Sequence, residues 1–427
     1  MTVDKLNFEI ETLGETKIDS PMKNVQFIKE ETKVLYNPKL DVIKAKLDAG
    51  IEPAAFQLAG PRRKIYFDPS KLRCGIVTCG GLCPGINDVI RSIVYSLYHH
   101  YGVRSIYGFQ YGYEGLIPEF QHPVIDMTPE FVEDLHEKGG TILHSSRGPQ
   151  NVEEQVDTLE RMNIGILFTI GGDGTLRGAR DIAEEVKKRG LKISIIGIPK
   201  TIDNDIAFVQ QSFGFETAIS QAKAAIYSAH IEANGARRGV GLVKLMGRHS
   251  GFIAANATLA TSDVNYCLIP EVEFSMEKLL NALEHRFTYK NHAVIVVGEG
   301  AGQNLFHENT ESDASGNVKF HDIGLHLKKT IKDHFAKLEA PVNVKYIDPS
   351  YIIRSMPANP HDSVLCLLLG HNAVHAGMAG YTNILVGSWN RQYINVPIPA
   401  AVSKRKKIDP AGALWNSVLA TTGQPQL

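Results

Sequence analysis

The segment Gly197-Ile-Pro-Lys-Thr-Ile-Asp-Asn-Asp205 begins inside a short apolar run, Ile193–Ile198, and then turns abruptly polar. An apolar run of this length is typical of a strand that is buried on both faces of a parallel sheet. In open α/β sheets, ligands bind outside the carboxyl ends of such strands. Lys200 could neutralise a phosphate there while Asp203 or Asp205 accepts a proton, so the segment predicts a catalytic strand end in an α/β fold.

A second polar strand end follows the apolar run Ile164–Ile170. Gly171-Gly-Asp-Gly-Thr175 opens a helical pattern there, and the first turn of a helix offers unpaired backbone N–H groups to anions. A carboxylate such as Asp173 suits a hard cation that also binds phosphates. These two ends together predict phosphoryl transfer. A third run ends at the glycine turn Gly80–Gly85, which lacks the Gly-x4-Gly-Lys-Ser/Thr pattern of ordinary P-loops.

Apolar runs and helical patterns alternate from about residue 71 onward, which predicts parallel sheets with helices on both faces. The predicted strands are Arg73–Cys79, Ile164–Ile170, Ile193–Ile198, Val240–Met246, Tyr266–Ile269, Ala293–Gly298, Val342–Tyr346 and Asn383–Gly387. The predicted helices are Ile86–Tyr98, Pro129–Glu137, Glu153–Met162, Leu176–Arg189, Glu216–Glu232, Phe252–Thr261, Met276–Phe287, Ile323–Leu338 and Ser363–Gly377. Residues 1–70 show no such rhythm and are expected to form a separate N-terminal arm. Asn309–Asn317 is expected to be an exposed loop, and the basic run Lys404–Lys407 a solvated surface patch.

The composition fits an enzyme with a large buried core and indicates neither nucleic-acid nor membrane binding. The 427 residues carry a formal net charge of -1 and are 43% hydrophobic. No apolar run approaches the roughly 20 residues of a membrane span, and the first residues lack the pattern of a signal peptide. The odd count of five cysteines argues against a disulfide framework, so a cytoplasmic location is expected. Cys74, Cys79 and Cys83 are expected to be small buried side chains rather than zinc ligands.

Five blocks, in this order, make the chain resemble the 6-phosphofructokinase family. They are Thr78-Cys-Gly-Gly-Leu-Cys-Pro-Gly-Ile-Asn87, Gly171-Gly-Asp-Gly-Thr175, Pro199-Lys-Thr-Ile-Asp-Asn-Asp205, Lys244-Leu-Met-Gly-Arg-His-Ser-Gly251 and Gly298-Glu-Gly-Ala-Gly-Gln303. The N-terminal arm makes the chain similar to the longer family members of trypanosomatids, plants and some bacteria, which are related to pyrophosphate-dependent enzymes. The resemblance implies two Rossmann-like domains with mostly parallel sheets flanked by helices, plus an N-terminal extension. The expected division is an extension at 1–70, a nucleotide and Mg²⁺ domain at 71–214 with a return segment at 353–400, a fructose 6-phosphate domain at 215–352 and a C-terminal tail at 401–427.

The resemblance also implies a reaction, in which the γ-phosphoryl group of ATP is transferred to the 1-hydroxyl of fructose 6-phosphate. Asp203 would be the general base, assisted by Lys200, Thr201 and Arg248, while Asp205 would assist the metal or orient its neighbours. The ATP site, with Mg²⁺ at Asp173, would be formed by Gly80, Arg147, Gly148, Gly172, Asp173, Gly174 and Thr175. The sugar-phosphate site would be formed by Thr201, Ile202, Asp203, Met246, Gly247, Arg248, Glu299, Lys345, Tyr351, Ile352, Ile353 and Arg354.

Two positions bear on the phosphoryl donor in the family that the chain resembles. Glycine at position 174 leaves space for the α-phosphate of ATP, where an aspartate would favour pyrophosphate. Lysine at position 200 occurs in pyrophosphate users, whereas short bacterial ATP enzymes usually carry glycine. The long ATP-using members combine this glycine with this lysine, so ATP is the expected donor and pyrophosphate the alternative.

Three positions depart from the short bacterial pattern of the family. Tyr351 replaces a histidine near the sugar phosphate. Lys345 replaces an arginine that reaches across a subunit boundary, so the charge is kept but the planar fork is lost. A second such arginine aligns closest to Gly239, with Arg237 and Arg238 just before it. The resemblance implies a homotetramer.

Two rival classes stay open. One is another kinase with a Gly-Gly-Asp-Gly-Thr loop, such as an NAD or lipid kinase, against which the Pro199–Asp205 and Met246–Arg248 blocks argue. The other is a non-catalytic regulatory subunit of the same fold, against which the presence of Asp173, Asp203 and Arg248 argues.

Overall fold

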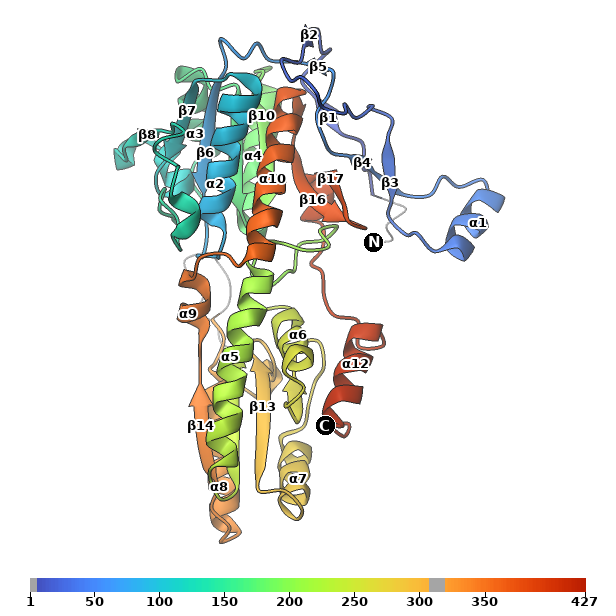
Figure 1. The fold of residues 1–427 in the computed structure, drawn as a ribbon, viewed down its shortest axis with the longest axis vertical. Coiled ribbons are helices and arrows are strands. Elements are labelled where there is room, and N and C mark those ends of the chain that lie inside the picture. The colour runs from blue at the N-terminus through green and yellow to red at the C-terminus, as the bar shows by residue number, and fades with distance from the viewer. Residues whose placement is uncertain (1–5, 307–318) are drawn as a thin grey trace. The chain divides into compact units, whose positions relative to one another are not determined.

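The fold is that of a computed structural model, which describes residues 6–306 and 319–427 (Figure 1). The loop expected at Asn309–Asn317 lies outside the described residues. The chain forms two compact units, and it passes between them several times. The first unit comprises the residues up to Ile202 together with Ile206–Gly214 and Ser355–Arg405. The second unit comprises Asp203–Asp205, Phe215–Arg354 and Lys406–Leu427.

The first unit is built on a nine-stranded sheet whose five central strands are parallel neighbours. In order across the sheet, the strands are β3 (Lys33–Leu35), β4 (Ala55–Leu58), β17 (Gln392–Pro397), β16 (Ile384–Trp389), β10 (Ser194–Pro199), β9 (Ile166–Gly171), β6 (Arg73–Thr78), β7 (Ser105–Phe109) and β8 (Val124–Asp126). The strands β16, β10, β9, β6 and β7 form the parallel centre, and the outer strands pair antiparallel. The central strands are almost entirely buried, as expected of a sheet that is covered on both faces.

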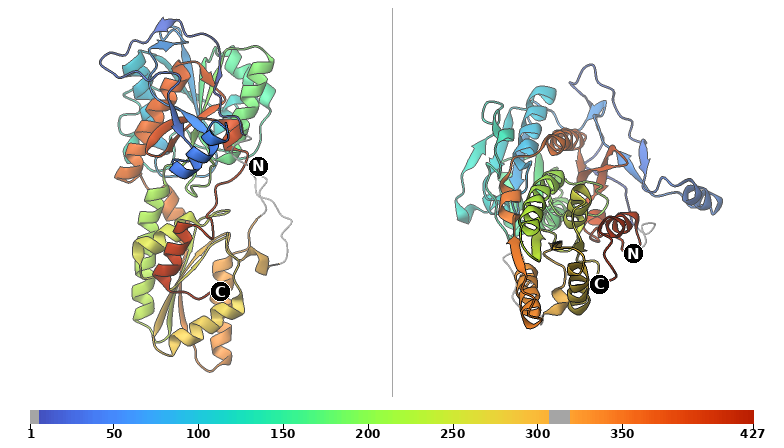
Figure 2. Two further views of the ribbon diagram at one scale, coloured as in Figure 1. Left: turned by 90° about the vertical axis from the view of Figure 1, so that its right-hand side faces the viewer. Right: turned by 60° about the horizontal axis from the view of Figure 1, so that its bottom comes forward.

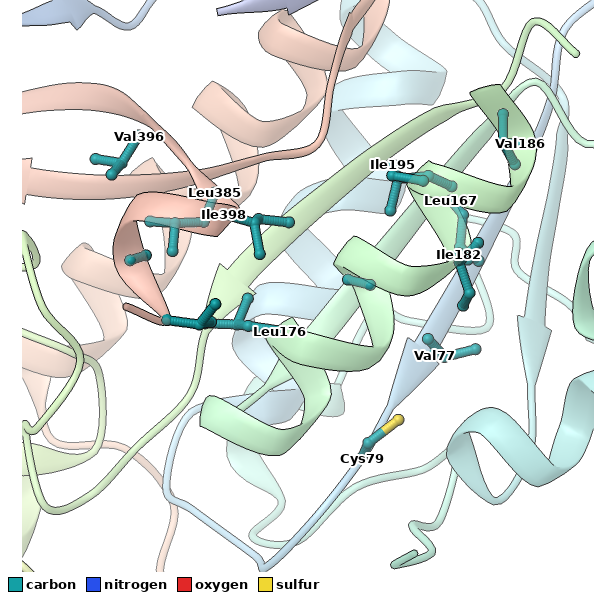
Figure 3. Close-up of a cluster of buried hydrophobic side chains, with 14 of the residues drawn as sticks. Val77, Cys79, Leu167, Leu176, Ile182, Val186, Ile195, Leu385, Val396 and Ile398 are labelled. Atoms are coloured by element: carbon teal, nitrogen blue, oxygen red, sulfur yellow. The ribbon is translucent and has the colours of Figure 1, made fainter. Parts of the chain in front are cut away.

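Helices cover both faces of this sheet, and alternate strand residues face each layer. α2 (Ile86–Tyr95) and α10 (Pro360–Met378) pack together, while α3 (Val152–Arg161) and α4 (Asp173–Lys188) form the other layer (Figure 1). Figure 3 shows the cluster beneath α4, where the helix residues Leu176, Ile182 and Val186 meet the strand residues Val77, Leu167 and Ile195. The helix is amphipathic with apolar residues three to four positions apart, so burying this face fixes its position on the strands.

The second unit has a smaller sheet in which every strand pair is parallel. The strand order is β12 (Tyr266–Leu268), β13 (His292–Gly298), β11 (Gly239–Leu245) and β14 (Asn343–Ile347). Its helices are α5 (Phe215–Asn234), α6 (Phe252–Thr261), α7 (Met276–Phe287), α8 (Ile323–Lys337), α9 (Ser350–Ser355) and α12 (Ala413–Thr422). The backbone of α5 comes so close to β11 that a Cβ at Gly241 would lie 2.6 Å from the carbonyl oxygen of Ala229. The α/β architecture with two mostly parallel sheets confirms the predicted fold class.

Two predicted details are wrong in the first unit. The segment Pro129–Glu137, predicted to be a helix, forms turns and a short 3-10 helix at Leu135–Glu137. It buries few side chains, so the helical pattern of its sequence has little packing to stabilise it. The helix predicted to end at Tyr98 changes to a π-helix at Ser96–Tyr101. The predicted burial of Cys74, Cys79 and Cys83 is confirmed.

The N-terminal segment 1–70 is less separate than its sequence indicates. Its strands β3 and β4 extend the large sheet through antiparallel pairing with β17. Phe56 is fully buried, and its ring lies 5.6 Å from that of Trp389. α1 (Leu40–Asp48), which buries no residue, stands off from the sheet (Figures 1 and 2).

The C-terminal residues divide between the units at a different point from the one expected. Residues up to Arg405 group with the first unit, and residues from Lys406 onward group with the second. There α12 packs against α6 and β12, and Gln424 hydrogen-bonds both backbone groups of Cys267. In the described parts of the chain, no helix is both long enough and apolar enough to cross a membrane.

Candidate active site

In the first unit, three neighbouring strands end at one edge of the sheet and bring three predicted segments together. The backbone N–H of Cys79, after β6, donates to the carbonyl of Ile170 at 3.0 Å. The backbone N–H of Lys200, after β10, donates to the carbonyl of Gly171 at 2.9 Å. The glycine turn after β6, the glycine-rich loop after β9 and the lysine after β10 are therefore adjacent, as the shared polarity of carboxyl strand ends leads one to expect.

Lys200 packs into the glycine turn. Its side chain is 6% exposed, and its ammonium group donates a hydrogen bond to the carbonyl of Gly81. Gly80 has a φ of +84°, and a Cβ there would lie 3.6 Å from the Lys200 ammonium nitrogen. The turn needs glycine for its backbone conformation, and the lysine places a positive charge beside it.

Asp173 begins α4 and is held by two guanidinium groups. Arg177 Nε lies 3.1 Å from its Oδ2, and Arg405 Nη2 lies 3.3 Å from the same oxygen. The side chain of Asp173 is 20% exposed. An aspartate in the first turn of a helix is stabilised by the positive end of the helix dipole as well as by these ion pairs.

The two residues after Asp173 differ in their surroundings. Thr175 is buried, and its carbonyl accepts a hydrogen bond from the Tyr113 hydroxyl at 2.7 Å. Gly174 is exposed, and among the described residues no heavy atom lies within 4 Å of the position that its Cβ would take. Packing in the protein itself therefore does not require glycine at position 174.

The Arg147–Gly148 segment is attached to the same glycine turn. Gly80 donates its backbone N–H to the Ser146 carbonyl at 3.0 Å, and the Ser145 hydroxyl donates to the Gly80 carbonyl at 2.6 Å. The exposed Arg147 follows directly, and Gly148 has a φ of +101°. The loop therefore places an exposed guanidinium group next in sequence to residues that bind the turn.

In the second unit, the predicted sugar-phosphate residues follow β11 and β13. The backbone N–H of Glu299 donates to the Leu245 carbonyl at 2.9 Å, and that of Gly300 donates to the Gly247 carbonyl at 3.2 Å. A Cβ at Gly300 would lie 2.0 Å from the Arg248 carbonyl oxygen, so only glycine fits there. The Met246-Gly-Arg248 loop and Glu299 are thus held together by main-chain hydrogen bonds.

Asp203 is fixed on this loop. Its Oδ2 accepts a hydrogen bond from the Arg248 backbone N–H at 3.2 Å, and its carbonyl accepts one from the Ser250 hydroxyl at 3.2 Å. The Arg248 guanidinium carbon lies 4.6 Å from the centre of the Phe320 ring. A carboxylate and an arginine are therefore held by one loop, which is an arrangement suited to proton transfer beside a phosphate.

Glu299 and Lys244, which lie at these strand ends, both have shifted pKa values. Burial raises the pKa of Glu299, although the charges of Arg248, Lys244 and Arg354 partly oppose the shift. Burial would lower the pKa of Lys244, but hydrogen bonds to Asp322 and Asp348 outweigh it and raise the pKa. Lys244 stands 2.8 Å and 2.9 Å from these two carboxylates, so it secures the end of β11 as a structural ion pair.

The predicted sugar-phosphate residues on β14 and α9 have mixed surroundings. Tyr351 is 82% exposed, and the Arg354 guanidinium carbon lies 5.0 Å from the centre of its ring. Ile352 is exposed, whereas Ile353 is fully buried and its side chain is a core contact. Lys345 lies within β14 in register with Gly241 and pairs with Glu232 at 3.2 Å. The structure therefore does not bring Lys345 to the strand-end loop that holds Asp203.

The basic run Lys404–Lys407 is not a simple solvated patch, and that expectation is wrong for two of its residues. Arg405 pairs with Asp173, as described above, and the Lys406 ammonium donates to Asn204 Oδ1 at 2.9 Å. Burial lowers the pKa of Lys406 to about 7, although the charge of Asp205 opposes the shift. Sequence reasoning missed these contacts, and the density of positive charge was the one signal that could have marked the run.

The carboxylates of the candidate site suit a magnesium ion that substrate phosphates also bind, rather than a metal ion held only by protein side chains. Within residues 6–306 and 319–427, no group of three or more His, Cys, Asp or Glu side chains could hold a metal ion. Magnesium commonly binds one or two carboxylates plus substrate phosphates and water. Asp173, at the start of a helix beside a glycine-rich loop, is a suitable single carboxylate for such an ion.

Comparison with known proteins identifies the family. The phosphofructokinase family model matches residues 73–377. The chain belongs to the phosphofructokinase family. It is 50% identical to the ATP-dependent 6-phosphofructokinase of Borreliella burgdorferi, over 99% of this chain and 98% of the relative. It is 46% identical to the ATP-dependent 6-phosphofructokinase of Trypanosoma brucei brucei, over 91% of this chain and 81% of the relative. These matches confirm the resemblance to the longer members of the family.

A solved structure supports the same fold. The pyrophosphate-dependent phosphofructokinase from Marinobacter aquaeolei superposes with a TM-score of 0.70 at 19% identity, over 83% of this chain and 92% of that protein. At this identity, the likeness concerns the fold alone.

Proposed function

We propose that the protein is an ATP-dependent 6-phosphofructokinase. It transfers the γ-phosphoryl group of ATP to the 1-hydroxyl of fructose 6-phosphate and yields fructose 1,6-bisphosphate and ADP, as in glycolysis. The observation that carries the proposal is the loop in which the Asp203 carboxylate accepts the backbone N–H of Arg248. That loop gives a proton acceptor and a phosphate-binding side chain a common support. The names of relatives that share about half of the sequence point to the same reaction.

The residues of the second unit are assigned to the sugar phosphate. Asp203 takes the proton of the 1-hydroxyl, and Arg248 offsets charge on the transferring group. Met246 and Gly247 shape the site, and Glu299 accepts hydrogen bonds from sugar hydroxyls. The assigned phosphate and sugar contacts of this unit also include Lys345, Tyr351, Ile352, Ile353 and Arg354, and Thr201 and Ile202, which belong to the first unit, are assigned to the same ligand. Of these, Ile353 contributes through its backbone, because its side chain is buried.

The residues of the first unit are assigned to the nucleotide. Gly80, Arg147, Gly148, Gly172, Gly174 and Thr175 line its phosphates. Lys200 provides positive charge, which favours the developing negative charge of the transferring group. Asp173 holds Mg²⁺, which supplies charge neutralisation on the phosphate oxygens when it is bound.

ATP is favoured over pyrophosphate by Gly174. No heavy atom of residues 6–306 and 319–427 lies within 4 Å of the position of a Cβ at Gly174, which supports a role of this space in binding a nucleotide. Pyrophosphate is the second candidate because Lys200 is also the residue of pyrophosphate users. We also propose a homotetramer and a cytoplasmic location. The resemblance to the family supports the first, and the five free, buried cysteines support the second.

The test is phosphorylation of fructose 6-phosphate by the purified protein with Mg²⁺, using ATP and pyrophosphate in parallel. Bisphosphate formed from ATP alone is the expected result. Bisphosphate formed from pyrophosphate alone would identify pyrophosphate, the second candidate, as the donor. Absence of product with either donor, from a folded homo-oligomer, would favour a regulatory subunit and overturn the proposal.

A further inference from the structure

The ion pair between Arg405 and Asp173 joins two parts of the first unit that are far apart in the sequence. Arg405 Nη2 lies 3.3 Å from Asp173 Oδ2. Arg177, one helical turn after Asp173, donates Nε to the same oxygen at 3.1 Å and Nη2 to the Val402 carbonyl at 2.9 Å. Arg177 therefore connects the carboxylate, the start of α4 and the segment that carries Arg405.

The backbone of Arg405 is fixed as well. It forms an isolated antiparallel bridge with Ile206, a residue of the same unit just beyond the Pro199–Asp205 block. The preceding Lys404 lies with its ammonium nitrogen 5.2 Å from the centre of the Phe208 ring. The guanidinium group of Arg405 is thus presented to the start of α4 by a held segment, and its side chain remains about one third exposed.

Charge is unevenly distributed around Asp173. One carboxylate faces two guanidinium groups at the N-terminal end of α4. The helix dipole adds to this positive potential. A site of this kind suits an incoming polyphosphate, and a guanidinium group binds phosphate oxygens through the same planar fork that it uses for carboxylates.

A magnesium ion held by Asp173 would compete with Arg405 for this carboxylate. Both arginines approach Oδ2 of Asp173, and a cation bound to this oxygen would repel them. Arg177 keeps the Val402 carbonyl as a second acceptor, and Asp173 Oδ1 lies 3.4 Å from its Nη2. A cation at Asp173 would weaken its hold on Arg405, and the phosphate oxygens of the donor, which arrive together with that metal, are anionic acceptors that a guanidinium group binds well.

We propose that Arg405 alternates between the carboxylate of Asp173 and the phosphate oxygens of the phosphoryl donor. This assignment rests on the proposed function for the identity of the donor, and it makes Arg405 a further donor-binding residue. Asp173 holds the guanidinium group until Mg²⁺ and phosphate arrive, which screens the carboxylate from metal without nucleotide.

The test measures metal binding and nucleotide binding separately on the Arg405→Gln variant of the full chain. Binding of Mn²⁺ alone, followed by electron paramagnetic resonance, should become several-fold tighter, because a competitor of the cation is removed. Binding of ATP with Mg²⁺, followed by calorimetry, should weaken by at least about tenfold, the effect of one charge-assisted hydrogen bond. Opposite signs are the signature, since a merely structural role would weaken both.

Two further variants keep the test decisive. Lys404→Gln removes the same charge one residue earlier and should leave both affinities within about threefold of wild type, because Lys404 contacts the Phe208 ring instead. Arg405→Lys keeps the charge and should recover part of the ATP affinity, which also covers the case in which Arg405→Gln does not fold. Unchanged ATP affinity, or metal and ATP affinities that fall together, would overturn the proposal.

The two proposals fail in different ways. A wild-type protein that phosphorylates fructose 6-phosphate from ATP while Arg405→Gln leaves both affinities unchanged retains the function and loses the role of Arg405. A wild-type protein that phosphorylates fructose 6-phosphate from pyrophosphate alone loses the proposed donor. The alternation of Arg405 between Asp173 and donor phosphate is then tested with pyrophosphate in place of ATP. It is overturned if Arg405→Gln does not bind Mn²⁺ more tightly and pyrophosphate more weakly than the wild type.

Discussion

Replacement of Gly174 by aspartate should stabilise the protein slightly and at the same time impair its use of ATP. The fold tolerates the change because no described heavy atom lies within 4 Å of the position of the new Cβ. Gly174 is the second residue of α4, where glycine costs roughly 0.5–1 kcal/mol relative to alanine. An added carboxylate near a helix N-terminus contributes about 0.3–1 kcal/mol. The free energy of unfolding should therefore rise by up to about 1 kcal/mol, after repulsion from Asp173.

The effect on ATP has the opposite sign. Two like charges 4 Å apart repel by about 1 kcal/mol in water and about 4 kcal/mol at an effective dielectric constant of 20. Gly174 is exposed, so an intermediate value of about 2 kcal/mol is reasonable. This corresponds to a loss of roughly 30-fold in kcat/KM for ATP, to which any steric conflict with the nucleotide adds.

The assay follows fructose 1,6-bisphosphate formation over a range of ATP concentrations, alongside urea unfolding of the same preparations. Gly174→Ala is the matched control, because it adds bulk and helix propensity without charge. It should gain stability and lose much less activity than the aspartate variant. A Gly174→Asp protein that is folded and retains kcat/KM for ATP within about threefold of wild type would refute the argument that this position selects the donor.

Three other changes test the base, a buried histidine and a glycine turn. The asparagine of Asp203→Asn can still accept the Arg248 N–H, so we expect intact folding but a kcat lower by at least about 10²-fold. Steady-state kinetics measure this loss, and a near wild-type kcat would exclude Asp203 as the base. Burial lowers the pKa of His375 to about 3, so the unfolded chain takes up its proton first as the pH falls below about 6.5. Urea unfolding should therefore show about 2 kcal/mol less stability at pH 5 than at pH 7.5 from this residue, and His375→Gln should flatten that dependence. Gly85→Ala would place a Cβ 2.6 Å from Cys366 Sγ at a φ of +98° and should lower the free energy of unfolding by about 2–4 kcal/mol. The control Gly102→Ala, at a φ of +79° with nothing within 4 Å among the described residues, should lower it only by the backbone strain of about 1–2 kcal/mol. Equal losses of stability in the two variants would contradict the packing argument.

The sequence indicates most of the buried parallel strands, because burial on both faces leaves a continuous apolar run. It misses β7, in which Ser105 and Tyr107 are only partly buried. The runs Ile164–Ile170 and Ile193–Ile198 overlap β9 and β10 almost completely. Outer strands have no such signal. β4 pairs with β17, whose residues are more than 300 positions away. β4 has only four residues and β17 has six, and neither is a continuous apolar run, so the sequence does not distinguish them from loops. Pairing over that distance is decided by the tertiary fold and not by any local pattern.

In the candidate site, as in the fold, the sequence predicts features that depend on a few neighbouring residues but not contacts between distant ones. Each glycine-rich block is readable because a close main-chain approach or a positive φ demands glycine over a few residues, as at Gly300 and Gly247. The pairing of Arg405 with Asp173 joins positions 232 residues apart, and no periodicity relates them. Lys345 shows the reverse case: its position in the sequence marks it as a phosphate contact, whereas its side chain pairs with Glu232 within the unit.

Gly174 favours ATP as the donor, whereas Lys200 is also the residue of pyrophosphate users. The role of each residue in the fold reduces this conflict. Lys200 has a structural reason to be a lysine, because its ammonium group donates to the Gly81 carbonyl and fills the space beside Gly80. A residue that supports the glycine turn is useful with either donor, so its presence alone does not favour pyrophosphate. Gly174 has no comparable reason, since an exposed glycine in the first turn of a helix costs stability and packs against nothing described. A residue that the fold does not need is better explained by the ligand, and the ligand that needs this space is the larger donor, ATP.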